Sequence, residues 1–405
     1  MNTLHSHTCL SRRQALSLFS SVSGAALLAA HAPSWAQALD SRAASANNRI
    51  LILVELKGGN DGLNTVVPYA DSSYYALRPG IAIKVGDVLK LDAKTGLHPE
   101  LKAALPLWEK GELAIVQGVG YPQANLSHFR SIEIWETASS ATEYLDDGWV
   151  GRAMKTGYGS RAKFTAEGVL IGNNDFGPLA GARAVSLNNP EAFLSQSRLA
   201  APAAVRGNAA LQHILAVENG TAQAAEGLRG DKFAFNTAFP GGAFGNGVRA
   251  ACQVVASQRG KDGGVPVLAL TLGSFDTHQN QPGLHANLLR QLAEGLAALK
   301  GGLMEIGAWD RTVVMTYSEF GRRPRQNGTN GTDHGTAAPH FVTGGAVRGG
   351  LYGQPPDLTR LDGTQNLIHT TDFRQLYATI AQQWWGVNAQ SVVRGNFEPL
   401  KFLRA

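Results

Sequence analysis

The sequence has 405 residues, of which 44% are hydrophobic, and 36 Lys+Arg against 31 Asp+Glu give a net charge of +5. No basic run marks a nucleic-acid surface, so we expect no nucleic-acid partner. Beyond residue 38 no apolar run reaches the roughly 20 residues that a transmembrane helix needs. Residues 39–405 contain one cysteine, Cys252, so they cannot form an intrachain disulfide. These properties indicate a globular chain of enzyme size that its hydrophobic core must stabilise.

The first 38 residues have the layout of a twin-arginine export signal. Arg12 and Arg13 precede a weakly apolar run over residues 16–30, and Ala36-Gln37-Ala38 offers a small-residue cleavage site. A frayed basic terminus and a membrane anchor are the alternatives, although the run is short and rich in serine and alanine for a membrane span. We therefore expect the twin-arginine export machinery as a partner, a periplasmic or cell-surface location, and a linker over residues 39–48.

Residues 49–405 predict a single α/β domain. Nearly continuous apolar runs are typical of strands buried on both faces, and they occur at 49–56, 113–119, 265–272, 312–317 and 341–343. Helical patterns occur at 99–110, 129–135, 283–299 and 372–385. The alternation favours a mostly parallel sheet. Residues 150–260 carry few strong apolar runs, so we expect an insertion or cap over the sheet there.

Three acidic residues follow predicted strands. Asp61 follows the first strand, Asp276 follows the strand at 265–272, and Asp333 lies in the long loop after 312–317. Ligand-binding groups gather beyond the carboxyl ends of strands in open α/β sheets. Carboxylates brought together there repel one another unless a cation binds between them. The alternatives are local: Asp61 as a turn former and Asp276 as a helix cap.

Two histidines accompany these carboxylates. His278 lies two residues after Asp276, and His334 follows Asp333 directly, between Gly331 and Gly335. Glycines permit backbone turns that a side chain would forbid. Carboxylate oxygens together with imidazole nitrogens suit one or two zinc, manganese or iron ions, so we expect a divalent metal as the cofactor.

Further candidates surround the proposed metal site. Ser127 precedes a helical pattern, where it is either a nucleophile near an anion-binding helix N-terminus or an ordinary N-cap. Glu319 is a candidate metal ligand or supporting acid, and Arg322 a candidate clamp for a phosphate or sulfate group; either could instead form an ordinary ion pair. His340 and His369 are candidates for the third ligand of a second metal.

The motifs in this order resemble the DUF1501 family of exported bacterial proteins. They are KGGNDGLNTVVP (57–68), SHFR (127–130), SFDTH (274–278), YSEFGRR (317–323) and GTDHGTA (331–337), and the resemblance spans about residues 50–385. That family looks like a branch of the alkaline phosphatase and sulfatase superfamily, which implies a three-layer α/β/α sandwich with a two-metal site for ester cleavage.

The resemblance implies a role for each matching position. Asp61 matches the first-strand metal aspartate, Ser127 the nucleophile, Asp333 and His334 the ligands on the nucleophile side, and Asp276 the aspartate of the other metal. Asn280 stands where the superfamily often has its next ligand, with His278 as the nearest substitute. The sulfatase Cys-x-Pro-x-Arg signature is absent, which speaks against a formylglycine sulfatase.

The resemblance therefore implies metal-dependent hydrolysis of a phosphate or sulfate ester, with a small-molecule or polymer-linked substrate. Two alternatives stay open. One is a non-catalytic exported binding or assembly protein on the same fold, which an incomplete second metal site would favour. The other is a transferase that modifies carbohydrate or lipid at the same site.

Overall fold

The computed structural model describes residues 48–160, 164–187, 233–260 and 263–404, which fall in the unit Asn47–Ala405. The expected export signal and all but the last residue of the expected linker lie outside these residues. Within the described ranges, no helix combines the length and apolar character that a membrane span requires.

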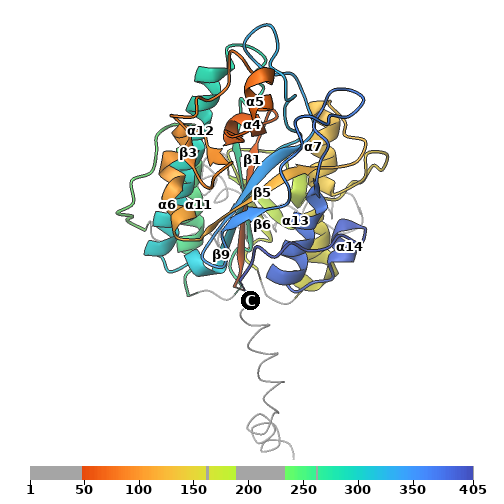
Figure 1. The fold of residues 1–405 in the computed structure, drawn as a ribbon. Coiled ribbons are helices and arrows are strands. Elements are labelled where there is room, and N and C mark those ends of the chain that lie inside the picture. The colour runs from red at the N-terminus through yellow and green to blue at the C-terminus, as the bar shows by residue number, and fades with distance from the viewer. Residues whose placement is uncertain (1–47, 161–163, 188–232, 261–262, 405) are drawn as a thin grey trace, which may run out of the picture. The chain divides into compact units, whose positions relative to one another are not determined.

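A nine-stranded sheet runs through the described structure (Figure 1). Its strands are β1 (Ile50–Leu56), β5 (Leu113–Gly120), β6 (Gly168–Ile171), β7 (Ala184–Leu187), β8 (Val267–Leu272), β9 (Thr312–Tyr317), β10 (Ala338–Thr343), β11 (Gly350–Tyr352) and β12 (Thr371–Asp372). The order is β11-β5-β10-β9-β1-β8-β6-β7, with β12 also paired to β5. Among the strand pairs of this sheet in the described residues, only those of β10 with β5 and β9 are antiparallel, so the expectation of a mostly parallel sheet is confirmed.

Helices cover both faces of this sheet and complete the α/β sandwich (Figure 1). One layer contains η1 (Pro99–Ala104), α6 (Leu105–Glu109), α11 (Gly242–Ser257) and α12 (Gln281–Glu305). The other contains α7 (His128–Thr137), α8 (Trp149–Ala153), η2 (Met154–Tyr158), η3 (Gly177–Leu179), α13 (Phe373–Thr379), η5 (Ile380–Trp384) and α14 (Ala389–Val393).

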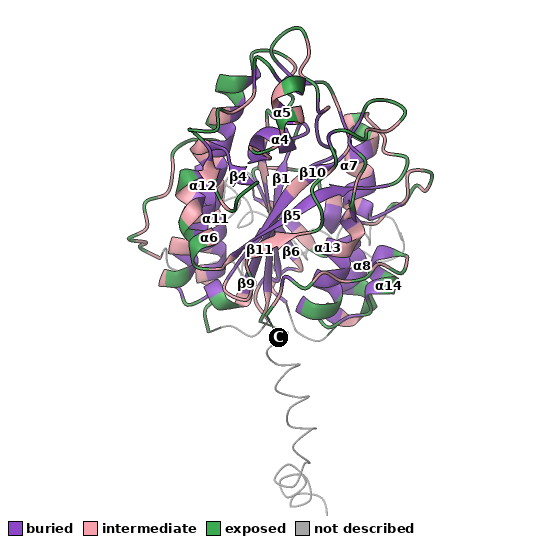
Figure 2. Ribbon diagram, viewed as in Figure 1, coloured by how far each residue is buried: buried purple, intermediate pink, exposed green. Residues whose placement is uncertain are grey.

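β1 shows why two layers form. Ile52 and Val54 pack in the core cluster on one face, and Leu51 and Leu53 pack in the cluster on the other face. Because successive side chains of a strand point to opposite faces, a continuously apolar strand needs cover on both sides. Figure 2 shows the resulting buried sheet between helices that are exposed on their outer sides.

Smaller elements lie outside the two layers. They are α4 (Gly62–Thr65), α5 (Ser72–Leu77), η4 (Trp309–Arg311) and a three-stranded sheet of β2 (Val66–Val67), β4 (Gly96–Leu97) and β3 (Leu89–Lys90), in that order. Together α4, β2, α5, β3 and β4 form the connection from β1 to η1, and they place Asp61 at the N-cap of α4.

The described parts of residues 150–260 belong to the sandwich itself, and the expected insertion or cap remains a prediction. β6 and β7 extend the central sheet, and α11 packs in the core cluster on one face. Residues 188–232 lie outside the described ranges. β6 and β7 have four residues each, which is too short to stand out as apolar runs, and α11 is rich in glycine and alanine.

Candidate metal centre

Three loops at the same edge of the sheet supply one cluster of side chains. His128 is the first residue of α7, after β5; Asp276 and His278 follow β8; and His334 lies in the loop between β9 and β10. β5, β8 and β9 end at one edge of the sheet because they run in the same direction. The strand ends therefore bring together residues that lie more than 200 positions apart.

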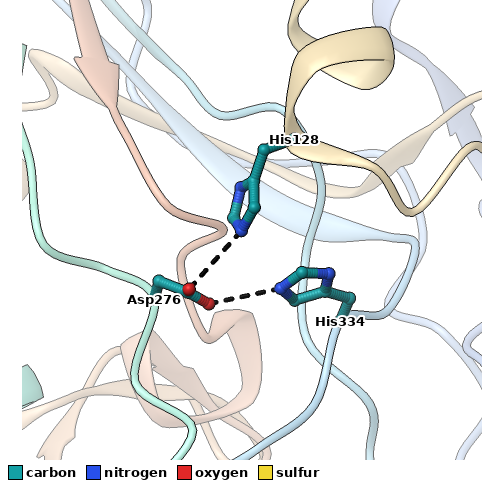
Figure 3. A group of neighbouring side chains, drawn as sticks. All are labelled: His128, Asp276 and His334. Carbon is teal, nitrogen blue, oxygen red and sulfur yellow. Dashed lines mark hydrogen bonds and ion pairs between the residues drawn. The ribbon is translucent and has the colours of Figure 1, made fainter.

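The metal-binding atoms of these residues converge on Asp276. One ligand atom each of His128, Asp276 and His334 lies within 4.8 Å of the others (Figure 3). Asp276 Oδ1 lies 3.2 Å from His334 Nε2, and Asp276 Oδ2 lies 3.5 Å from His128 Nε2. His278 Nε2 adds a fourth group, 3.0 Å from Asp276 Oδ1 and 3.1 Å from His334 Nε2. We call these four residues the metal centre.

Each histidine of the metal centre is held by its other ring nitrogen. His128 Nδ1 lies 2.7 Å from Glu319 Oε1, and His278 Nδ1 lies 3.2 Å from Asp333 Oδ1. His334 Nδ1 lies 2.8 Å from the carbonyl oxygen of Leu126. Metal-ligating histidines nearly always donate their second N–H to a carboxylate or a carbonyl in this way, because that bond fixes the tautomer and the ring orientation.

The partners of Nδ1 determine what Nε2 can do. A carbonyl oxygen and a carboxylate only accept, so each Nδ1 carries a proton, and in its neutral form each ring offers a lone pair at Nε2. With all three rings in that form, three lone pairs face one carboxylate, and two of the nitrogens are 3.1 Å apart. Acceptors at that distance repel one another unless a cation lies among them. The arrangement is that of a nitrogen-rich divalent metal site.

Arg322 holds the carboxylate of Asp276 in the metal centre through a hydrogen bond. Its side chain is fully buried, and Nη2 donates to Asp276 Oδ1 at 2.5 Å. Nε donates to the carbonyl oxygen of Gly59 at 2.7 Å, and Nη1 to that of Thr332 at 2.8 Å. The expectation that Arg322 clamps a substrate is therefore corrected: all three nitrogens donate to the protein itself, and no face of the guanidinium reaches solvent.

Local charge explains the protonation of the centre. Burial raises the pKa of Asp276, but the hydrogen bond and the charge of Arg322 outweigh burial, so the pKa lies below its ordinary value. The hydrogen bond to Glu319 raises the pKa of His128 against the opposing effect of burial. Burial lowers the pKa of His334. Asp276 is thus ionised and His334 neutral at neutral pH, as metal binding requires.

Two glycines let the ligand loops approach. A Cβ atom on Gly331 would lie 2.2 Å from the backbone carbon and oxygen of His278, and one on Gly335 would lie 2.3 Å from the backbone carbon of Arg322. Residues 322 and 334 form a β-bridge, which folds the loop back on itself. Neither glycine is among those with positive φ, so close packing explains them and the expected special turns do not.

Asp61 lies outside the metal centre, which corrects its expected role as a ligand. Its side chain is fully buried, and Oδ2 accepts from Arg78 Nη1 at 2.6 Å and from Gln281 Nε2 at 2.5 Å. Burial raises the pKa of Asp61, but the charge of Arg78 outweighs it and lowers the pKa below the ordinary value. Gln281 also accepts from Thr277 Oγ1 and Thr332 Oγ1, so Asp61 is connected to the ligand loops only through hydrogen bonds.

The other expected site residues take different places. Ser127 is exposed beside His128, and its side chain makes no capping hydrogen bond. Asp333 lies beside Nδ1 of His278, and Glu319 lies beside Nδ1 of His128, so each carboxylate contacts a histidine of the metal centre from its outer side. His340 is buried against Trp135 with an unpartnered Nδ1, and His369 is half-buried; neither belongs to the cluster found among the described residues.

His128 is the member of the candidate site that was not predicted from the sequence. It stands in the SHFR motif directly after Ser127, at the first position of α7. The signal that could have identified it is a histidine at the start of a helix that follows the end of a strand.

The chain was compared with known families and proteins. The family described as "Protein of unknown function (DUF1501)" matches residues 188–397, which is more than half of the chain. The chain belongs to the DUF1501 family. The matched residues include Asp276, His278, Glu319 and His334, whereas the motifs at 57–68 and 127–130 lie before the matched stretch. No curated protein matches the chain in sequence.

Solved structures similar to this chain include members of the alkaline phosphatase superfamily and sulfatases. Ps i-CgsB, in complex with k-i-k-neocarrahexaose, has 11% identity and a TM-score of 0.45, with 86% of this chain and 75% of that chain covered. A protein in the alkaline phosphatase superfamily from Vibrio parahaemolyticus has 8% identity and a TM-score of 0.43, with 88% and 71% covered. The phosphonate monoester hydrolase from Silicibacter pomeroyi has 11% identity and a TM-score of 0.42, with 87% and 76% covered.

Proposed function

We propose that this DUF1501 protein is an exported, metal-dependent hydrolase of phosphate or sulfate esters. The observation that carries the proposal is the convergence of three histidine Nε2 atoms on Asp276, with every Nδ1 held by an acceptor. The export part of the proposal rests on the paired arginines Arg12 and Arg13 ahead of an apolar run. A small-molecule or polymer-linked ester is the substrate that we propose for this centre.

The metal centre is open to a substrate. The side chains of Asp276 and His278 are 47% and 43% exposed, and that of His128 is 34% exposed. A divalent ion bound by these residues would polarise an ester oxygen and lower the pKa of an adjacent hydroxyl or water. Zinc, manganese and iron all suit the ligands, and the described residues support one such ion.

Ser127 is the proposed nucleophile. It precedes the ligand His128 directly, is exposed, and makes no capping hydrogen bond, so its hydroxyl is available for attack. Arg322 contributes by holding Asp276 as a carboxylate, and Glu319 contributes by holding the ring of His128. In the proposed reaction Ser127 Oγ would attack the phosphorus or sulfur atom while the ester oxygen leaves as an alcohol with the proton of the hydroxyl group. Water would then cleave the serine ester and release phosphate or sulfate.

The second candidate function is a non-catalytic exported binding or assembly protein. Two observations favour it. The buried ion pair with Arg78 takes Asp61 away from any second metal, and no described side chain accepts a hydrogen bond from Ser127 Oγ to activate it. A bound metal would then serve to hold the three loops or to bind a partner.

Hydrolysis assays separate the two candidates. The purified full chain, loaded with zinc, manganese or iron(II), is assayed with p-nitrophenyl phosphate, bis(p-nitrophenyl) phosphate and p-nitrophenyl sulfate. The hydrolase proposal expects turnover of at least one ester that is lost in His334→Ala and reduced by at least a hundredfold in Ser127→Ala, with His369→Ala as the matched control. Metal binding without turnover of any ester would favour the non-catalytic candidate.

A further inference from the structure

A cavity of about 600 Å³ lies apart from the metal centre. It lies among the α4–β2 segment, the residue before β4, the end of β5, the start of β10 and the loop after β11. None of the four residues of the metal centre lines it. Ligand pockets in proteins have volumes of about 300–1,000 Å³ and are mostly apolar with a few well-placed polar groups.

Gln117 is a polar residue that lines this cavity and follows a run of core residues on β5. On β5 the side chains of Leu113 and Ile115 pack in one core cluster, and those of Ala114 and Val116 pack in the other. Gln117 comes next, at the register shift between Val116 and Val119 where the alternation breaks, and it lines the cavity. Val66, a member of the same core cluster as Leu113 and Ile115, also lines it.

The carboxamide of Gln117 has no partner within the described structure. The residue is 7% exposed, and only its backbone carbonyl takes part in a hydrogen bond outside the sheet, from Thr371 Oγ1. Its side-chain oxygen and nitrogen are not among the fully enclosed polar atoms that lack a partner, so they are accessible to solvent in the cavity. The side chain therefore faces open space in the cavity, where a ligand would pair with it.

Thr95 offers a second polar group from another element. It is 8% exposed and lines the cavity just before β4. Its backbone is held by Asp92 and Leu91, while no hydrogen bond within the described structure uses its hydroxyl. Two mostly buried polar side chains without a hydrogen bond in the described structure, one on β5 and one on the residue before β4, thus line a single cavity.

The remaining walls are apolar and rigid. Four prolines line the cavity, and a proline ring presents apolar surface at little cost in conformational entropy; they are Pro68, Pro339, Pro355 and Pro356. Asp71, Asp92 and Lys94 also line it, and Asp92 and Lys94 are exposed. No buried charge lines the interior, so the cavity suits a neutral ligand, because a charged one would lose hydration without a buried counter-ion.

We propose that this cavity binds a neutral ligand through a secondary amide group. A carboxamide offers one acceptor and two donors, so a secondary amide can accept from an N–H of Gln117 through its oxygen or donate to the oxygen of Gln117 through its N–H. The Thr95 hydroxyl adds one further bond, and the proline walls pack against the apolar groups beside the amide. An acylated amino sugar and an acylated amino acid both present this chemistry.

Calorimetric titration of the full chain tests the proposal. The probes are N-acetylglucosamine and N-acetylalanine methylamide, with glucose and methyl acetate as counterparts that lack the amide. We expect at least one amide probe to bind with a Kd on the order of 1 mM, which is ordinary for a ligand of this size. Its amide-free counterpart should bind at least tenfold more weakly. The probe that binds more tightly identifies the source of the amide.

Variants assign the binding to the cavity. Gln117→Met and Thr95→Val, each close in shape to the parent residue, should weaken binding of the amide probe by about tenfold and about threefold. Gln390→Met, at an exposed position on α14, should not change it. His334→Ala should bind the probe as the parent does, which separates this site from the metal centre. No binding of either amide probe by the parent, or parental affinity in both cavity variants, would overturn the proposal.

Discussion

The Nε2 atoms of His278 and His334 lie 3.1 Å apart, and Asp276 Oδ1 lies 3.0 Å from the first and 3.2 Å from the second. The Nδ1 atoms of both rings face acceptors, so in their neutral forms both rings present lone pairs at Nε2. A cation among these three atoms turns a repulsive contact into a binding site. The loops that carry these residues are held in place by buried hydrogen bonds of Arg322.

Gly331→Ala should weaken metal binding without unfolding the chain. A Cβ at this position would lie 2.2 Å from the backbone of His278, so the ligand loops must move apart. Gly328→Ala, in the same loop with nothing within 4 Å of its Cβ, is the matched control. Competition with a chromogenic chelator measures the affinity, and we expect a loss of at least tenfold for Gly331→Ala alone. Equal affinities in the two variants would contradict the packing of these loops.

Glu319→Gln should lower the metal affinity by about 10- to 100-fold, the usual effect of removing a carboxylate that holds a ligating histidine. The bond from His128 Nδ1 to Glu319 Oε1 is 2.7 Å long and buried on the Glu319 side. Glu109→Gln, an exposed position on α6, provides the control. An affinity for zinc in Glu319→Gln equal to that of the parent would show that Glu319 does not position His128.

Asp61→Asn should destabilise the fold and leave the metal content unchanged. The change leaves the fully buried guanidinium of Arg78 without its carboxylate, and breaking such a pair costs about 3–5 kcal/mol. Urea unfolding measures the loss. Atomic spectrometry of the folded variant should find the parental amount of metal. A variant of normal stability that has lost its metal would instead make Asp61 a ligand.

The sequence predicted the sheet better than the site. Strand ranges such as 312–317 agree with the structure because strands buried on both faces have unmistakable apolar runs. The helical pattern at 372–385 agrees with α13 and η5, whose first N-cap, Asp372, forms a capping box. Asp276, His278 and His334 were placed together correctly from their positions after strands.

The misassigned residues share a physical cause. Asp61 and Arg322 each bind partners that no local pattern reveals: Arg78 lies 17 residues from Asp61, and Asp276 lies 46 residues from Arg322. A buried arginine that neutralises a carboxylate looks the same in sequence as a free one that binds substrate. The distinction depends on the three-dimensional path of the loops.

Acid should destabilise the folded chain through its buried histidines. Burial lowers the pKa of His340 to about 3, whereas in the unfolded chain the ordinary value is about 6.5. Between these values the unfolded chain binds one more proton than the folded chain, so stability falls as the pH drops below about 6.5, by about 1.4 kcal/mol per pH unit for this histidine.

His340→Phe should reduce that dependence. The aromatic contact with Trp135 can be kept, while the titrating group and its unpartnered Nδ1 are removed. Urea unfolding between pH 6 and pH 4 should show a slope smaller than that of the parent by about 1.4 kcal/mol per pH unit. The same slope in parent and variant would show that His340 is not a neutral, buried histidine in the folded chain.

The metal content of the purified full chain tests the central claim most directly. After dialysis against metal-free buffer, plasma mass spectrometry should find about one divalent ion per chain in the parent and in the control variant His369→Ala. Asp276→Ala and His334→Ala should each retain less than a tenth of that amount, with circular dichroism confirming that they are folded. A parent chain that binds no divalent ion when zinc, manganese and iron(II) are supplied, or full metal content in both ligand variants, would contradict the metal centre.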